Sequence, residues 1–226
     1  MLSRLSPGKA IAATSVLLAV TIVWIAIMGL FTPLAVRTDE SFICGRKAIL
    51  NIELARHAGD LKNSLAWDTK SQGNAIRDVR LNTKMDLLFI VLYWLTILSA
   101  ASIVLQLDSR LVSRLVLFGC ILVTIAAVGD YIEDYYIFQM LASVDTGVIT
   151  NAMATAIHRP SIVKWITLGA GCLLLGVALL VGGRIFLDRR RLAVSAWIYG
   201  ALTLLAGGFC LSNVWCFWCD WPGARF

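Results

Sequence analysis

Residues 111–141 read LVSRLVLFGCILVTIAAVGDYIEDYYIFQML, a long apolar run that passes directly into an acidic stretch. At about 1.5 Å per residue, a helix over this range is longer than the roughly 30 Å apolar layer of a bilayer. Offsets of three and four residues place Asp130, Glu133 and Asp134 on one helix face. The segment therefore predicts a membrane-spanning helix whose last turns carry a stripe of carboxylates.

The composition of the whole chain agrees with a membrane protein. Its 226 residues are 59% hydrophobic and 15% charged, with a mean hydropathy of +0.79. A soluble domain of this length would lack the polar surface needed to cover such a core. We attribute the formal net charge of +6 to basic residues that set the topology and contact anionic lipid headgroups. Membrane lipids are therefore the expected partners, and no nucleic-acid partner is expected.

Five apolar runs are long enough to cross a bilayer, which predicts an all-α polytopic helical bundle in one integral membrane domain. The expected spans cover about residues 10–34, 85–107, 111–141, 162–187 and 192–214. The first run exceeds the apolar core of a signal peptide and lacks a small-x-small cleavage site, so we expect it to be an uncleaved span. Pro160 is expected in the first turn of the fourth spanning helix.

Residues 36–84 form the one long polar segment, expected on the outer side. Its apolar positions with a helical repeat are Leu50, Leu54, Ala58, Leu61 and Leu65. This periodicity predicts an amphipathic outer helix that lies on the membrane or on the ends of the bundle. Residues 71–74, Ser-Gln-Gly-Asn, predict a turn or linker before the second span.

Basic residues in the short loops predict the orientation of the chain. They gather in the loops that are cytoplasmic if the N-terminus is inside: Arg4, Lys9, Arg110, Arg114, Arg184, Arg189, Arg190 and Arg191. The positive-inside rule then places the N-terminus in the cytoplasm and the C-terminus outside. By this topology, one lysine and four carboxylates lie at the outer ends of their spans, at similar depth.

These charged residues, together with one tyrosine, form a candidate site for a small cation or a polar ligand. The candidate residues are Asp86, Tyr93, Asp130, Glu133, Asp134 and Lys164. Closely spaced carboxylates can hold a proton near neutrality, and a lysine can instead neutralise one of them. The alternative is a structural network that ties helix ends together at the membrane interface.

A metal site has less support in the sequence. The acidic residues could combine with His57 or His158 as oxygen and imidazole ligands. The chain has no H-E-x-x-H and no E-x-x-H pair, so we expect neither a bound metal nor another cofactor. A Gly-rich phosphate loop, a G-x-S-x-G motif and a haem-type histidine pair within the spans are also absent.

The six cysteines separate by their depth in the membrane. Cys120, Cys172 and Cys210 lie within spans and are expected to be packing residues. Cys44, Cys216 and Cys219 lie on the expected outer side, where an oxidising compartment favours a disulfide from Cys44 to one of the other two. The Cys216-x-x-Cys219 spacing also fits a redox motif, although a thioredoxin context is missing.

Small residues repeat on the last two spans. Gly169, Cys172, Gly176 and Gly183 lie near one face of the fourth span, and Gly200 and Gly207 lie on the fifth. Small residues at such spacing let membrane helices approach closely. We therefore expect these small residues to lie where the last two spans pack closely against other helices.

The sequence of residues 86–93, D-L-L-F-I-V-L-Y, resembles a pattern D-x-L-F-I-x-x-Y of a group of small, functionally uncharacterised bacterial membrane proteins. Asp130 and Glu133 match a second pattern, D-x-x-E-N, in which Asp134 stands in place of the asparagine. Lys164 matches a lysine that opens a later span. The resemblance covers about residues 53–164, with Glu53 and Trp67 also similar, and implies a shared bundle and polar site but no activity. We expect the bacterial inner membrane as the location.

Three classes of function are open from the sequence. The first is an outward-facing polar site that binds, and moves, a small cation or polar ligand. The second is an outer-leaflet enzyme, either a thiol oxidoreductase that uses Cys216 and Cys219 or a metal-assisted hydrolase that uses the carboxylates. The third is a structural subunit of a membrane complex, including a homo-oligomer.

Overall fold

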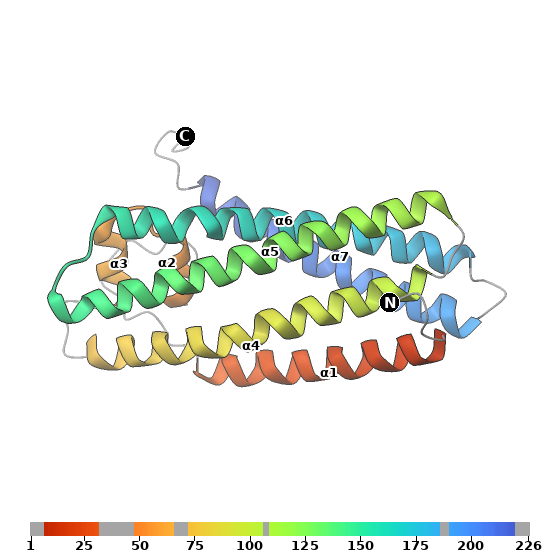
Figure 1. Cartoon of the computed structure of the whole chain (residues 1–226), viewed down its shortest axis with the longest axis horizontal. Coiled ribbons are helices and arrows are strands. Elements are labelled where there is room, and N and C mark those ends of the chain that lie inside the picture. The colour runs from red at the N-terminus through yellow and green to blue at the C-terminus, as the bar shows by residue number, and fades with distance from the viewer. Residues whose placement is uncertain (1–6, 32–47, 66–71, 106–108, 186–189, 220–226) are drawn as a thin grey trace. The chain divides into compact units, whose positions relative to one another are not determined.

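The computed structural model describes residues 7–31, 48–65, 72–105, 109–185 and 190–219, and their regular structure is helical (Figure 1). In chain order the elements are α1 (Pro7–Phe31), α2 (Ala48–Leu54), α3 (Ala58–Ser64), α4 (Gln72–Val104), α5 (Arg110–Ser143), the 3-10 turn η2 (Val144–Thr146), α6 (Asn151–Ile185) and α7 (Arg190–Cys219). The fold class predicted from the sequence, an all-α polytopic bundle, is confirmed.

Five helices, α1, α4, α5, α6 and α7, are long and apolar enough to cross a membrane. The chain is therefore a multi-pass membrane protein. Helices α4, α5 and α6 contain 33, 34 and 35 residues. At about 1.5 Å per residue each is roughly 50 Å long, which exceeds the apolar layer of a bilayer.

Helix α4 begins at Gln72, so the turn or linker predicted over residues 71–74 was wrong at residues 72–74, and Ser71 lies outside the described residues. The polar residues at its start belong to the helix because the following turns are anchored by packing. Ala75 is 9% exposed and Val79 is fully buried. This tertiary burial outweighs the weak local preference of Gly73 and Asn74 for a turn.

Helix α6 begins at Asn151, and Pro160 lies inside it rather than in its first turn. A proline in a helix removes one backbone donor and crowds the preceding turn. The residues before it, Ala154 and Ile157, are fully buried and hold that turn in place. The hydroxyl of Ser161 also donates a hydrogen bond of 2.8 Å to the carbonyl of Ile157.

The single amphipathic helix predicted in the long polar segment is replaced by two short helices, α2 and α3. The chain breaks between them because His57 has an extended backbone, with φ −130° and ψ 157°. Oδ2 of Asp60 accepts hydrogen bonds of 3.0 Å from the backbone N–H groups of Arg56 and His57, which caps α3. Leu61 and Leu65 are fully buried. These helices therefore pack in a core with the adjoining end segments of α4, α5 and α6, which agrees with the second of the two predicted positions, on the ends of the bundle.

The chain divides into two compact units. The first unit comprises Met1–Val23, Val91–Ala127 and Trp165–Ser212, and the second comprises Trp24–Ile90, Val128–Lys164 and Asn213–Phe226. Helices α4, α5 and α6 each contribute residues to both units.

In the first unit, glycines let helices approach closely. A Cβ atom at Gly176 of α6 would lie 3.1 Å from the carbonyl oxygen of Gly200 on α7, and one at Gly207 would lie 3.0 Å from that of Gly169. The predicted packing of the small residues on these two spans is confirmed. Polar side chains tie α1 to its neighbours, for example Thr21 Oγ1 to Thr96 Oγ1 at 2.8 Å.

Gly171 provides a direct test of this close packing. A Cβ atom there would lie 2.8 Å from Cγ2 of Val123 and 3.0 Å from the backbone oxygen of Gly119. We expect Gly171→Ala to lower the free energy of unfolding in detergent by about 1–3 kcal/mol, because a backbone atom cannot move aside as a side chain can. Gly208→Ala is the matched control, since nothing lies within 4 Å of its added Cβ. Equal effects of the two substitutions would contradict the packing.

The second unit has an apolar core built mainly by α2, α3 and the adjoining parts of α4, α5 and α6. Its buried members are Ile52, Ala55, Leu61, Leu65, Val79, Ile137, Met140, Leu141, Val144, Ile149, Ala154 and Ile157. The core positions α2 within the unit, and α2 carries the acidic residue Glu53.

Candidate functional site

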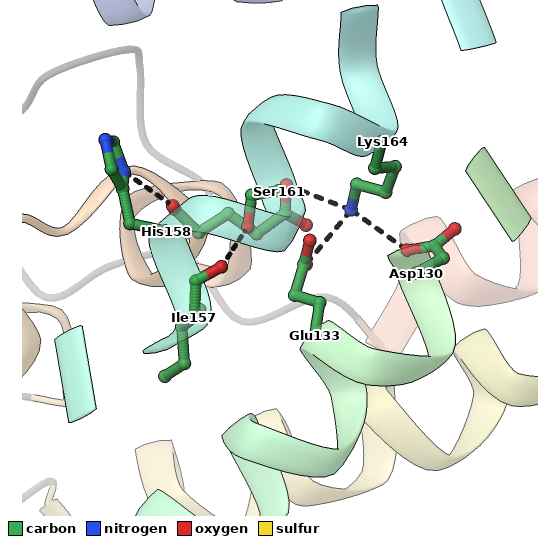
Figure 2. Close-up of polar contacts among 7 residues, drawn as sticks. Asp130, Glu133, Ile157, His158, Ser161 and Lys164 are labelled. Atoms are coloured by element: carbon green, nitrogen blue, oxygen red, sulfur yellow. Dashed lines mark hydrogen bonds and ion pairs between the residues drawn. The ribbon is translucent and has the colours of Figure 1, made fainter. Parts of the chain in front are cut away.

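Lys164 lies at the centre of a buried group of carboxylates in the second unit. Its Nζ is 3.0 Å from Oδ1 of Asp130, 3.0 Å from Oε1 of Glu133 and 3.3 Å from Oε2 of Glu53. Figure 2 shows the ammonium group between Asp130 and Glu133, with dashed lines marking the contacts. We call these four residues the Lys164 cluster. The cluster joins α2, α5 and α6 through one ammonium group.

The sequence of α5 and α6 explains why these charges meet. Asp130 and Glu133 are three residues apart and share a face of α5. Gly129 permits the close approach of α6, because a Cβ atom there would lie 3.5 Å from the carbonyl oxygen of Pro160 and 3.6 Å from Cβ of Lys164. The predicted pairing of Lys164 with the carboxylates of the third span is confirmed.

Glu53 is the member of the Lys164 cluster that the sequence analysis did not include among its site residues. It lies on α2, and its backbone oxygen is 3.3 Å from Nδ1 of His158 on α6. The backbone N–H of Ala58 donates a 2.8 Å hydrogen bond to Oδ1 of Asn151, also on α6. One feature of the sequence could have identified Glu53 as a site residue. It is an acidic residue inside the apolar run I-L-N-I-E-L-A, residues 49–55, of an otherwise polar segment.

Two further carboxylates, Asp86 and Asp134, belong to the same unit but to none of the three ion pairs. Asp134 is only 1% exposed, and its Oδ2 accepts no hydrogen bond from the residues that the structure describes. Asp134 interacts electrostatically with Asp86 and with Asp130. The second unit therefore holds two acids in addition to the three that pair with Lys164.

Apolar side chains lie between the Lys164 cluster and the nearby ends of α4, α5 and α6. Val79 of α4, Ile137 and Met140 of α5 and Ile157 of α6 belong to the apolar core. Each lies nearer than the charged residues to that end of its own helix. The exposed fractions of the charged residues are 1–5% for Glu53, Asp130, Glu133, Asp134 and Lys164. Asp86 is half-buried and is the most accessible of these charges.

Tyr93 is the one predicted site residue that lies outside the second unit. It lies on α4 in the first unit and is 7% exposed. Its predicted part in the site therefore stays a prediction. The remaining predicted residues, Asp86, Asp130, Glu133, Asp134 and Lys164, all lie in the second unit.

Among the described residues, no group of three or more His, Cys, Asp or Glu side chains is placed to hold a metal ion. The position between the three carboxylates is taken by the ammonium group of Lys164 instead. A metal-assisted hydrolase therefore gains no support from this geometry.

The predicted disulfide falls outside the described part of the chain. Cys44 is not described, and neither are the side chains of Cys216 and Cys219. No disulfide joins the described cysteines Cys120, Cys172 and Cys210. The disulfide and the thiol oxidoreductase both stay predictions.

Together, the fold and the cluster define a multi-pass helical membrane protein with buried carboxylates gathered around one lysine. Comparison with protein-family models, with curated proteins and with solved structures finds no match. The resemblance over residues 53–164 to small bacterial membrane proteins therefore stays a prediction as well.

Proposed function

We propose that this protein binds a small cation, a proton included, at its buried acidic residues and carries that cation across the membrane. The observation that supports the proposal is the buried side chain of Asp134, whose Oδ2 accepts no hydrogen bond from the described residues. An ionised carboxylate is costly in apolar surroundings unless a positive charge accompanies it. A site of this kind therefore favours the uptake of positive charge.

The size of the electrostatic effect supports uptake of more charge than Lys164 carries. Glu53, Asp130 and Glu133 already surround its ammonium group at 3.0–3.3 Å. Asp86 and Asp134 add two more carboxyl groups that interact electrostatically with Asp130. Like charges repel more strongly in a protein interior than in water, because the effective dielectric constant is lower. Binding of a proton or another cation relieves this repulsion.

The proposed location is the bacterial inner membrane, with the N-terminus in the cytoplasm. The support is the arginine bias of the short loops, which favours this orientation under the positive-inside rule. In that orientation Asp86, Asp130, Glu133, Asp134 and Lys164 lie toward the outer ends of their spans.

A purely structural role is the second candidate. The observation in its favour is that three ion pairs tie α2, α5 and α6 to one lysine. Such a network orders the helices even if no ligand ever binds. The two proposed functions give Asp134 different roles. Cation binding uses its carboxylate, whereas the structural role does not, because Asp134 takes no part in those ion pairs.

The test is ion flux in vesicles that contain the purified protein. We expect wild-type protein to dissipate an imposed proton or monovalent-cation gradient faster than protein-free vesicles, and Asp134→Asn to lose at least tenfold of that rate. Asp78→Asn is the matched control, because Asp78 also lies on the second unit, two turns before Asp86, and makes none of the ion pairs. Wild-type flux equal to that of empty vesicles for every cation would favour the structural role.

A further inference from the structure

We infer that one face of α4 binds the headgroups of anionic lipids at the point where this helix enters the membrane. The face carries the basic residues Arg77, Arg80 and Lys84, which we call the basic stripe, and continues into the exposed apolar residue Leu88. The inference goes beyond the proposed cation site, because the buried acids described above take no part in it.

The helical repeat and the packing of α4 together place the basic stripe on the surface. Successive offsets of three, four and four residues put Arg77, Arg80, Lys84 and Leu88 on one helix face. All three basic residues are exposed, and Leu88 is 45% exposed. Val79 and Thr83 of the same helix segment are fully buried and fix its rotation. The basic stripe therefore points away from the core of the second unit.

The charge of the basic stripe is not neutralised by the part of the chain that the structure describes. None of its three residues makes an ion pair with a described residue. Asp78 is the one acidic residue in the sequence from 73 to 84, so this segment has a formal net charge of +2. Asp78 is half-buried and follows Arg77 directly, and neighbours in sequence do not face each other on a helix. The exposed face thus presents positive charge to its surroundings.

Helix α6 shows the same order of residues. Arg159 is exposed, and Val163, four residues later on the same face, is 46% exposed. Both residues lie in the second unit, as do the basic stripe and Leu88. On each helix an exposed cation is therefore followed, one turn deeper in the span, by an exposed apolar side chain.

This order matches the chemistry of a lipid. A lipid carries an anionic phosphate directly beside apolar chains, whereas a nucleic acid or an acidic peptide offers the negative charge without those chains. Arginine binds phosphate through two parallel hydrogen bonds, and lysine binds it as a point charge. Long basic side chains near the ends of membrane helices also extend toward the headgroups. The partner that fits the basic stripe and Leu88 together is an anionic lipid.

Photocrosslinking of the full-length protein in vesicles tests this directly. The vesicles consist of phosphatidylcholine with a small fraction of phosphatidylglycerol that carries a photoactivatable acyl chain, and the comparison uses phosphatidylcholine with the same chain. We expect the anionic probe to label residues 81–88 at least fivefold more than the neutral probe, since each basic residue near an anionic surface contributes about a factor of five. Equal labelling by the two probes, or no labelling by either, would overturn the inference.

Substitutions locate the charge that selects the lipid. Replacing all three residues of the basic stripe with glutamine should bring the ratio of the two probes to about one. Arg110→Gln, a change of an exposed arginine at the start of α5, is the matched control and should leave the ratio at residues 81–88 unchanged. An excess that survives the triple replacement would contradict the assignment. If millimolar inorganic phosphate removes the excess and sodium chloride of equal ionic strength does not, the stripe binds free phosphate and the lipid assignment is wrong.

Discussion

Replacing Lys164 with alanine is expected to lower the free energy of unfolding in detergent by about 3–5 kcal/mol, the cost of leaving buried charges without their partner. Glu53, Asp130 and Glu133 lie 3.0–3.3 Å from its Nζ and would repel one another once the ammonium group is gone. Chemical denaturation followed by circular dichroism measures the loss. A cost of only about 0–1 kcal/mol would mean that water screens these charges.

A double-mutant cycle separates this interaction from a general loss of packing. Asp130→Asn alone should also destabilise the protein, because Lys164 loses one of its three carboxylate partners. The double variant Lys164→Ala with Asp130→Asn should lose less than the sum of the two single losses. Asp78→Asn, outside the cluster, should instead add to Lys164→Ala within about 0.5 kcal/mol. Strict additivity for Asp130 would show that the two residues do not interact.

Leu61→Ala is expected to cost about 2–5 kcal/mol, the usual range for truncating a fully buried leucine. Leu61 lies on α3, is 0% exposed, and belongs to the core that includes Ile52 beside Glu53. The size of the loss depends on how far the surrounding side chains collapse into the cavity. The free energy of unfolding in detergent is again the measured quantity.

Leu81→Ala is the matched control for the core. Leu81 lies on α4 in the same unit and is 40% exposed. We expect its replacement to change stability by about 0.5 kcal/mol or less. If both leucine substitutions have the same small effect, α3 is not held by this core, and α2 would need another anchor to place Glu53 at Lys164.

Local signals in the sequence predicted two helix starts wrongly. Gly73 and Asn74 favour a turn, and Pro160 favours a first turn, yet they lie inside α4 and α6. The reason is that apolar residues on the neighbouring turns, such as Val79 and Ile157, are fully buried. The free energy gained by burying these apolar side chains exceeds the cost of placing Gly73, Asn74 and Pro160 inside a helix.

Some of the charged residues of the site could be predicted to meet from the sequence, and one could not. Asp130, Glu133 and Lys164 could be expected to meet, because consecutive spanning helices run in opposite directions and bring alternate ends to one side. Glu53 could not be assigned in this way, because it lies on a seven-residue helix outside the spans. Its contact with Lys164 depends on how α2 packs on α6, through His158 and the apolar core.

The sequence by itself determined the five spanning helices and the acidic stripe on α5. A bilayer requires an apolar run of a minimum length, and the helical repeat of 3.6 residues sets which side chains share a face, so both are local properties of the chain. Only the tertiary structure decided that Glu53 lies against Lys164 and that Oδ2 of Asp134 is buried with no hydrogen bond from the described residues. Those outcomes depend on distances of a few ångströms between segments far apart in the chain, and packing alone sets such distances.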